Sequence, residues 1–382
     1  ITKGENMKKL LALVIAAGLC AGLCGCASTM KIDADVHLIP SITDGSEPDA
    51  GLPGEKGENG EQGYDGGSGT RVTSAEDIKK AIEQTAEGGT AEISLANDLI
   101  LSEPLKITAD TVIHGNGYKV KLDSDIKNPI FNGGKNNLTL DNMTLDGQNN
   151  RVYDYFGAIN GGEGSSLTLS NVTIENVEAE RIIRAVSVQS VNLTNVTIRN
   201  NKTSNSKDGA YGLLFTNVEN MTLKNVSIND NNICLLYNIG KSLIMVWDND
   251  MIWGNDKVNA LTAESLTIEN NTIGEHILAT LGTDCSDTIT LTSGSIRGNN
   301  TAGIYMVGNL TIGKGMNVQC GITLNNDSDG SVCTLANDGT ITGDIASADW
   351  AAKDSGLPNY TGTGTHTGSK NNITDLTAPV QP

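Results

Sequence analysis

Apolar and polar residues in the middle of the chain repeat a phrase of alternating character. The four strict copies read LTLDNMTL from Leu138, LTLSNVTI from Leu167, VNLTNVTI from Val191 and MTLKNVSI from Met221. The looser copies read MVWDNDMI from Met245, LTIENNTI from Leu266, ITLTSGSI from Ile289 and LTIGKGMN from Leu310. Successive copies begin 21 to 30 residues apart. A period of this length predicts a solenoid, in which each repeat packs only on its neighbours.

Within each phrase the pattern predicts a half-buried β-strand interrupted by one turn. The first, third and eighth positions are apolar in nearly every copy, which is the alternation of a strand. The fifth position is usually Asn, which tolerates the left-handed backbone conformation and can bend the chain at a single residue. Stacked coils would place these side chains about 4.8 Å apart, within hydrogen-bonding reach of each other.

The predicted ladder of fifth-position residues comprises Asn142, Asn171, Asn195, Asn225, Asn249 and Asn270, with Asn337 added if CTLANDGTI from Cys333 is a further coil. Ser293 and Lys314 interrupt this ladder, so we expect the late coils to be less regular. With this turn, residues 91–348 resemble the right-handed parallel β-helices of the pectate-lyase-like superfamily. The resemblance implies an all-β solenoid of three-strand coils over residues 91–350, about ten coils long, and does not specify an activity.

The amino-terminal residues predict export and a lipid anchor. Met7 is followed by two lysines, a short apolar run and the sequence LCGC that ends at Cys26. This arrangement fits a signal peptide over residues 7–25, whose apolar run is too short to span a membrane comfortably. LCGC resembles a bacterial lipobox, which implies cleavage before Cys26 and acylation of its thiol; an ordinary signal peptide is the alternative. Residues 1–6 precede this better start and read as a translation artefact.

A tether and a glycine-rich spacer are predicted after the anchor. Residues 26–50 are polar and unpatterned, and glycine then recurs at every third position over residues 51–69. Only glycine fits the axis of a collagen triple helix, so this segment resembles bacterial collagen-like sequences and would permit a homotrimer. It contains a single proline, Pro53, so a flexible spacer is the alternative interpretation.

The solenoid is predicted to begin with a helical cap and to end before a flexible tail. The segment from Thr73 to Glu76 is a capping box, and Ile78 and Ile82 share one helical face within residues 70–90. This helix would cover the apolar end of the first coil, where a bare solenoid exposes unpaired strand edges. Residues 351–382 lack periodicity and predict a disordered tail or a short terminal cover.

The net charge narrows the classes of partner that the chain can bind. The formal charge is −19, from 26 basic and 45 acidic residues, which argues against nucleic acid, anionic membrane surfaces and polyanionic glycans as unassisted partners.

Four cysteines follow Cys26, namely Cys234, Cys285, Cys320 and Cys333. We expect unpaired core cysteines rather than a disulfide, because a β-helix closes its coils without one. The cysteine and histidine spacings of zinc sites are absent from the sequence.

Two long coils predict a binding site at one corner of the solenoid. Their extra residues run from 146 to 157 and from 199 to 212, two coils apart, so they should lie about 10 Å from each other. Loops on a rigid scaffold commonly carry recognition, and aromatic side chains beside charged ones suit sugars; decoration without function is the alternative. The candidate ligand-binding residues are Tyr153, Asp154, Tyr155, Arg184, Asp208 and Tyr211.

Catalysis has less support in the sequence. Superfamily polygalacturonases carry Asn-Thr-Asp and Gly-His-Gly phrases, and neither occurs here. Pectate lyases combine calcium-binding acids with a catalytic arginine, and the corresponding candidates are Asp154, Arg181 and Arg184. A run containing Asp327 and Asp329 follows the first half of a calcium loop, which makes Ca²⁺ the one cofactor to consider. Its twelfth position is Ala336 rather than Glu, which favours an Asx-rich turn.

Together these patterns predict a bacterial cell-envelope lipoprotein, anchored in the membrane and extracytoplasmic. Its predicted role is that of a surface-displayed scaffold or adhesin-like module that binds glycans or a host surface without catalysis. The alternatives are a polysaccharide lyase or glycoside hydrolase of the same fold, and a purely structural surface spacer, since fold alone does not decide function.

Overall fold

The computed structural model describes the solenoid and its amino-terminal cap. It covers residues 69–153, 156–203, 211–233, 242–247, 259–281, 285–300, 303–326, 331–348 and 356–377. The predicted signal peptide, lipidation site Cys26, tether and almost all of the glycine-rich spacer lie outside the described residues.

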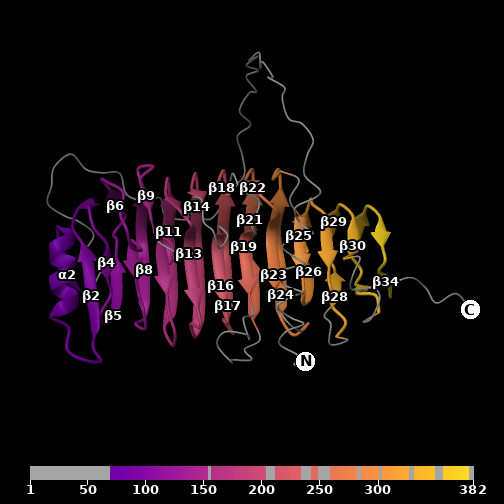
Figure 1. The fold of residues 1–382 in the computed structure, drawn as a ribbon, viewed down its shortest axis with the longest axis horizontal. Coiled ribbons are helices and arrows are strands. Elements are labelled where there is room, and N and C mark those ends of the chain that lie inside the picture. Colours follow the sequence, from indigo (N-terminus) through magenta and orange to yellow (C-terminus); the bar gives the residue numbers. More distant parts are fainter. Residues whose placement is uncertain are drawn as a thin grey trace, which may run out of the picture. The chain divides into compact units, whose positions relative to one another are not determined.

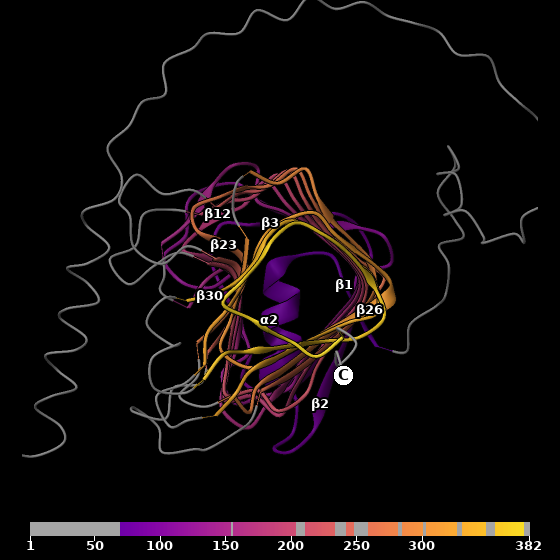
Figure 2. The same ribbon diagram turned by 90° about the vertical axis from the view of Figure 1, so that its right-hand side faces the viewer.

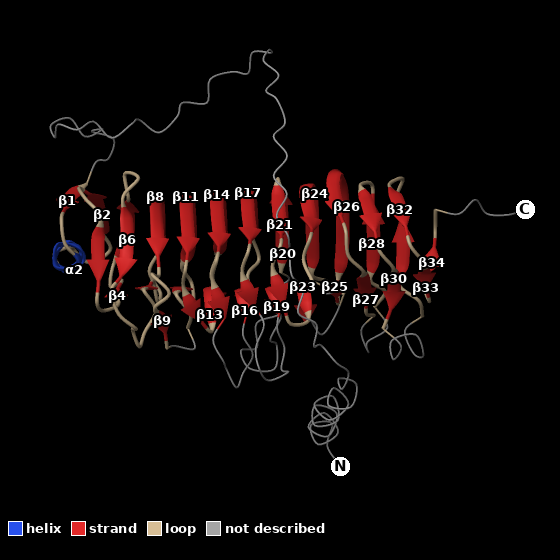
Figure 3. Ribbon diagram, turned by 90° about the horizontal axis from the view of Figure 1, so that it is seen from above, coloured by secondary structure: helices blue, strands red, loops and turns tan. Residues whose placement is uncertain are grey.

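The strands pair in parallel, and their coils stack along one axis as a β-solenoid of about ten coils (Figure 1), which confirms the predicted fold class. Seen from above, strands of successive coils lie side by side, with the single described helix at one end (Figure 3). The strands form three sheets.

The first sheet contains β1 (Thr70–Val72), β2 (Thr90–Leu95), β3 (Leu99–Leu101), β5 (Asp110–His114), β6 (Lys119–Leu122), β8 (Leu138–Asp146), β11 (Ser166–Glu175), β14 (Ser190–Arg199), β17 (Met221–Asn229), β20 (Ala260–Glu264), β21 (Leu266–Glu269), β24 (Thr288–Arg297), β26 (Asn309–Val318), β28 (Thr334–Asn337), β29 (Thr340–Thr342), β31 (Asn359–Thr361), β32 (Thr365–Thr367) and β34 (Thr374–Asp375).

The second sheet contains β4 (Leu105–Lys106), β7 (Phe131–Asn132), β10 (Ile159–Gly161), β13 (Arg181–Val186), β16 (Tyr211–Thr216), β19 (Ser242–Trp247), β23 (His276–Leu281), β25 (Gly303–Met306), β27 (Ile322–Leu324), β30 (Ile345–Ser347) and β33 (Lys370–Asn371). The third sheet contains β9 (Arg151–Val152), β12 (Glu178–Ala179), β15 (Lys202–Thr203), β18 (Asn232–Ile233) and β22 (Thr272–Ile273).

The helix α2 (Ala75–Glu83) covers the first coil, as predicted. The capping box lies one residue later than predicted, because Ser74 rather than Thr73 is the N-cap and its hydroxyl accepts a hydrogen bond from the backbone N–H of Asp77 at 3.2 Å. Ile78 and Ile82 on one face are buried in the core. Viewed along the stack, α2 lies across the opening of the coils (Figure 2). The helix therefore covers the apolar side chains at the end of the first coil. In the rest of the solenoid such side chains are covered by a neighbouring coil.

Neighbouring coils stack in register, so equivalent residues form columns along the solenoid. Leu138, Leu167, Val191 and Met221, the first residues of the strict phrases, are successive partners in β8, β11, β14 and β17. All four are buried, as are the third, sixth and eighth positions of these phrases. The strand prediction is confirmed for these coils, and the core is a pile of aliphatic layers.

The predicted turn is confirmed at four early positions, and the predicted ladder of amide bonds is confirmed from Asn171 to Asn225 but does not include Asn142. Asn142, Asn171, Asn195 and Asn225 have left-handed φ values between 49° and 55°. Nδ2 of Asn225 donates to Oδ1 of Asn195 at 2.9 Å, and Nδ2 of Asn195 donates to Oδ1 of Asn171 at 2.8 Å. Nδ2 of Asn171 donates to Oδ1 of Asp141 at 3.2 Å. This ladder is solvent-exposed.

The looser copy at Met245 is not a first-sheet strand, and that prediction was wrong. Met245 belongs to β19 of the second sheet, between β16 and β23. The first sheet continues instead with β20 and β21, and the turn between them falls at Ser265 (φ 56°). A second-sheet strand also alternates apolar residues, so its sequence resembles the phrase. Asn249 lies outside the described residues.

Two other ladder assignments were wrong because their coils were read out of register. Asn270 (φ 57°) follows the second arm of its coil and aligns with Asn200 at the next corner. Asn337 pairs with Ile312 at an inward position and is fully buried. Its Nδ2 donates to the hydroxyl oxygen of Tyr360 at 3.0 Å. The loss of register after Ser293 agrees with the irregularity expected there, because β24 and β26 shift between positions 291 and 293.

A second, buried ladder lies at the corner before the third sheet. Oδ1 of Asn231 accepts hydrogen bonds from the backbone N and the Nδ2 of Asn201, both at 3.0 Å. Asn231 makes the same two bonds to Asn271, and Asn271 makes them to Asn299. Each Nδ2 of these three donors also bonds to a main-chain carbonyl of the preceding coil. The hydrogen-bonding groups of each buried amide are thus satisfied by the equivalent asparagine of the neighbouring coil.

The stack continues beyond residue 350, where a disordered tail or a short terminal cover was predicted. β31, β32 and β33 pair with β28, β29 and β30 of the preceding coil. Lys370 takes the place of inward-facing Ile345, with its Nζ 2.7 Å from Oδ2 of Asp375 and 3.8 Å from the centre of the Tyr360 ring. A charge at this core position ends the apolar column. Short strands of Thr and Asn lack apolar periodicity, which is why the sequence did not predict this coil.

A disulfide joins Cys285 to Cys333, whose Cα atoms lie 5.4 Å apart. The expectation of unpaired cysteines was wrong for this pair, because stacking brings together corners that 48 residues separate in sequence. Cys320 is a free thiol, and burial raises its pKa to about 12. Cys234 lies outside the described residues.

The buried ladder should contribute more to stability than the exposed one. Replacing Asn231 by Val should lower the free energy of unfolding by about 3 kcal/mol, because the bonding groups of Asn201 and Asn271 lose buried partners. Replacing Asn225 by Val should cost about 1–2 kcal/mol, since a β-branched residue is forced to positive φ and one exposed bond is lost.

Lys224→Thr, on the exposed face beside this ladder, is the matched control and should change stability little. Chemical unfolding of the three variants checks the order. If Asn231→Val and Lys224→Thr unfold at the same denaturant concentration, the buried ladder does not stabilise the solenoid.

Candidate functional site

The two coils predicted to be long carry their extra residues between the third sheet and the second, and a third long connection, of eight residues between β18 and β19, was not predicted because Met245 was assigned to the first sheet. One residue separates β12 from β13, whereas six separate β9 from β10 and seven separate β15 from β16. All three connections run from the third sheet to the second. β9 and β15 flank β12, so the two extended connections begin about 10 Å apart.

The structure places only some of the predicted ligand-binding residues at an open surface. Tyr153 is 49% exposed, and Arg184 is partly exposed. Tyr211 is 7% exposed and packs with Leu214 and Met245, which leaves little of its ring for a ligand. Asp154, Tyr155 and Asp208 lie outside the described residues.

Two exposed aromatic rings flank the first long connection, each stacked on an arginine. The guanidinium carbon of Arg151 lies 4.4 Å from the ring centre of Tyr153, whose hydroxyl donates to Oδ2 of Asp125 at 3.2 Å. The guanidinium carbon of Arg184 lies 4.9 Å from the ring centre of Phe156, which is 43% exposed. These contacts orient both rings at the surface.

Arg184 and Arg181, the two arginine candidates, have different environments. Nη1 of Arg184 donates to Oδ1 of Asn160 on the neighbouring strand at 2.9 Å. Arg181 is 1% exposed, with its Nη1 3.3 Å from Oε2 of Glu180 and its guanidinium 5.7 Å from the Tyr211 ring. Arg181 is therefore buried against the second sheet, whereas Arg184 is partly exposed at the surface.

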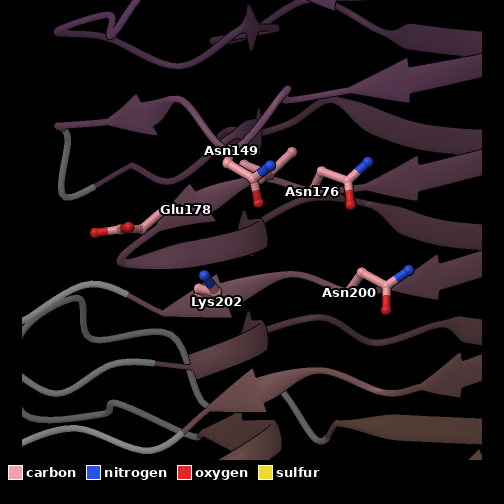
Figure 4. A pocket seen from close by; sticks show the side chains of 6 residues that line it. Asn149, Asn176, Glu178, Asn200 and Lys202 are labelled. Carbon is pink, nitrogen blue, oxygen red and sulfur yellow. The ribbon is translucent and has the colours of Figure 1, made fainter.

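A small polar depression of about 10 Å³, enough for one water molecule, lies where the chain turns from the first sheet into the third, and we call it the corner groove. Asn149, Asn176 and Asn200 line it from successive coils, with Glu178 and Lys202 beside them (Figure 4); Val177 completes the lining. The three asparagines have φ values between 55° and 62°, so they turn the chain from the first sheet into the third. Glu178 and Lys202 are partners in β12 and β15.

The hydrogen-bonding groups of the corner groove are only partly used. Nδ2 of Asn176 donates to Oδ1 of Asp146 at 3.0 Å. The side-chain amides of Asn149 and Asn200 make no hydrogen bond within the described part of the chain. Nε of Arg151 lies 3.4 Å from Oε1 of Glu178 at the rim of the groove. The amides of Asn149 and Asn200 are exposed and thus face solvent beside these charged side chains.

The two nearest buried carboxylates are fully engaged by neighbouring residues. Nε and Nη2 of Arg199 donate to Oε2 of Glu175 at 2.9 and 2.7 Å. Asp146, in register with Glu175, accepts hydrogen bonds from Asn176 and from the backbone and side chain of Gln148. Burial alone would raise the pKa of Asp146, but these hydrogen bonds hold that pKa below its usual range.

The asparagines of the corner groove were not among the predicted site residues, although the sequence carries a signal for Asn176 and Asn200. In consecutive coils an Asn follows the ninth phrase position, as in Glu175-Asn176 and Arg199-Asn200.

Metal and membrane features are reported for the described ranges alone. These contain no group of three or more His, Cys, Asp or Glu side chains placed to hold a metal ion. Asp327 and Asp329 lie outside them. Nor does any helix among these residues have the length and apolar character that a membrane crossing requires.

Comparison with protein-family models, with curated proteins and with solved structures finds no match for this chain.

Proposed function

We propose that this chain is a lipid-anchored, extracytoplasmic β-solenoid that binds glycans on the surface formed by the third sheet and the first long connection. The observation that carries this proposal is the exposed ring of Tyr153, which Arg151 holds at the surface near the exposed amide of Asn149. Amides and charged groups exchange hydrogen bonds with sugar hydroxyls, and an exposed aromatic face can pack on a sugar ring.

Location outside the cytoplasm has two independent supports. The amino-terminal sequence has a basic start, an apolar core and a lipobox-like LCGC ending at Cys26. The disulfide between Cys285 and Cys333 is of a kind that persists in oxidising compartments. A lipid anchor with two or more acyl chains would hold the solenoid stably at the membrane.

Binding is favoured over catalysis by the chemistry of the described residues at the corner. A general acid or a nucleophile needs a carboxyl group that can reach substrate. The carboxylate oxygens of Asp146 and Glu175 instead accept hydrogen bonds from other residues of the protein. Glu178 has its carboxylate beside Arg151 at 3.4 Å, an arrangement suited to holding hydroxyl groups.

A glycan array combined with an assay for released sugar products tests this function. The protein should bind glycans without releasing product. Tyr153→Ala should weaken binding by about tenfold, since an anchor aromatic contributes about 2 kcal/mol, and should leave the melting temperature unchanged. Leu281→Ala, which removes an exposed apolar side chain on a distant coil, should bind normally. Product release would favour the lyase or hydrolase, and absence of any binding would favour the structural spacer.

The anchor is tested by Cys26→Ser. The substitution removes the thiol that would be acylated, so labelling with a radioactive fatty acid should disappear and the protein should move from membrane to soluble fractions. A Ser variant that stays firmly in the membrane fraction would show that another anchor exists.

A further inference from the structure

The disulfide joins the first and the third of three successive coils. Cys285 precedes β24 and Cys333 precedes β28, and β26 lies between these two strands in the first sheet. Both cysteines are buried at the corner where the chain passes from the second sheet to the first. The bond therefore links coils that are not neighbours, which backbone pairing alone does not do.

The middle coil is bound at the same corner through its backbone and one amide. The backbone N–H of Gly308 donates to Sγ of Cys333 at 3.1 Å. Nδ2 of Asn309 donates to the carbonyl oxygen of Cys285 at 2.8 Å, and its Oδ1 accepts from the backbone N–H of Thr334 at 3.1 Å. The disulfide and these three hydrogen bonds hold three coils at one point, and we call these five residues the corner clasp.

The corner clasp begins where a column of buried polar side chains stops. Asn259 and Asp287 are buried at this corner in the two coils before Gly308. The backbone N–H and Nδ2 of Asn259 donate to Oδ1 of Asp287 at 2.9 and 3.1 Å. The next two residues of the column, Gly308 and Cys333, carry neither an amide nor a carboxylate side chain. The clasp thus replaces side-chain hydrogen bonding at this corner.

Other links between coils also end before the coils that follow β24. Within the described ranges, the third sheet has no strand after β22, and the buried asparagine ladder ends at Asn299. The register of β24 and β26 shifts between positions 291 and 293. The later coils keep their aliphatic core and their backbone pairing. Because each coil of a solenoid packs only on its neighbours, such an end can open while the rest stays folded.

We infer that the corner clasp makes the coils from β25 to β34 a redox-sensitive unit, which is ordered while the disulfide is intact and opens when a dithiol reduces it. One thiolate of the dithiol attacks a protein sulfur and forms a mixed disulfide, which the second thiolate then resolves. The dithiol leaves as a cyclic disulfide, and its two protons pass to the sulfurs of Cys285 and Cys333. Reduction removes the cross-link, which spans 48 residues of sequence and restricts the open state.

Hydrogen–deuterium exchange of the full chain, before and after reduction with dithiothreitol, tests this inference. Alkylation followed by mass spectrometry establishes that Cys285 and Cys333 have become thiols. Amides of β26, β27, β28 and β30 should then exchange about tenfold faster or more, since their opening no longer works against the cross-link. Amides of β11, β14 and β17 should change by less than about twofold, because the two asparagine ladders hold their coils.

The variant that carries both Cys285→Ala and Cys333→Ala should show the exchange pattern of the reduced protein without any reductant. Cys320→Ala is the matched control, because Cys320 is a free thiol of the same coils, and this variant should keep its response to dithiothreitol.

Two outcomes would overturn the inference. One is unchanged exchange of the late coils after full reduction of the disulfide. The other is equal acceleration in β11, β14 and β17, or a double variant that fails to fold at all, because the late coils would then not be a separate unit.

Discussion

The structure depends on parallel backbone hydrogen bonding between coils in register. Neighbouring strands lie about 4.8 Å apart, so every position of the repeat becomes a column along the solenoid. Inward columns of Leu, Val and Ile make the core. At the corners, columns of Asn form hydrogen bonds from one amide to the next, both in the buried ladder and in the exposed one. Because the same register governs every column, a site on the surface can be composed of residues that are 24 to 30 positions apart in sequence.

Much of this architecture could be predicted from sequence because each strict phrase encodes its own strand and turn. Leu138, Leu167, Val191 and Met221 fall into one column, and their Asn turns follow. The prediction failed where the local pattern does not specify the sheet. Apolar and polar residues also alternate around Met245, but this strand belongs to the second sheet. It also failed where the core becomes polar, as at Lys370 in the last coil.

The candidate site was predicted in position and only partly in composition. Coil lengths place the connections after β9 and β15 on one corner, but the longer connection after β18 was missed because Met245 was assigned to the first sheet. Which side chains reach the surface depends on packing between coils, so Tyr211 is buried while Tyr153 is open. The pairing of Cys285 with Cys333 depends on the same packing.

The central claim is that three successive coils together form one ligand site. Hydrogen–deuterium exchange with and without a bound array-selected glycan tests it most directly. The account predicts that exchange slows together in residues 149–152, 176–179 and 200–203, because these segments line the corner groove. Protection confined to one coil, or located on the exposed ladder of Asn171 and Asn195, would contradict a site composed at this corner.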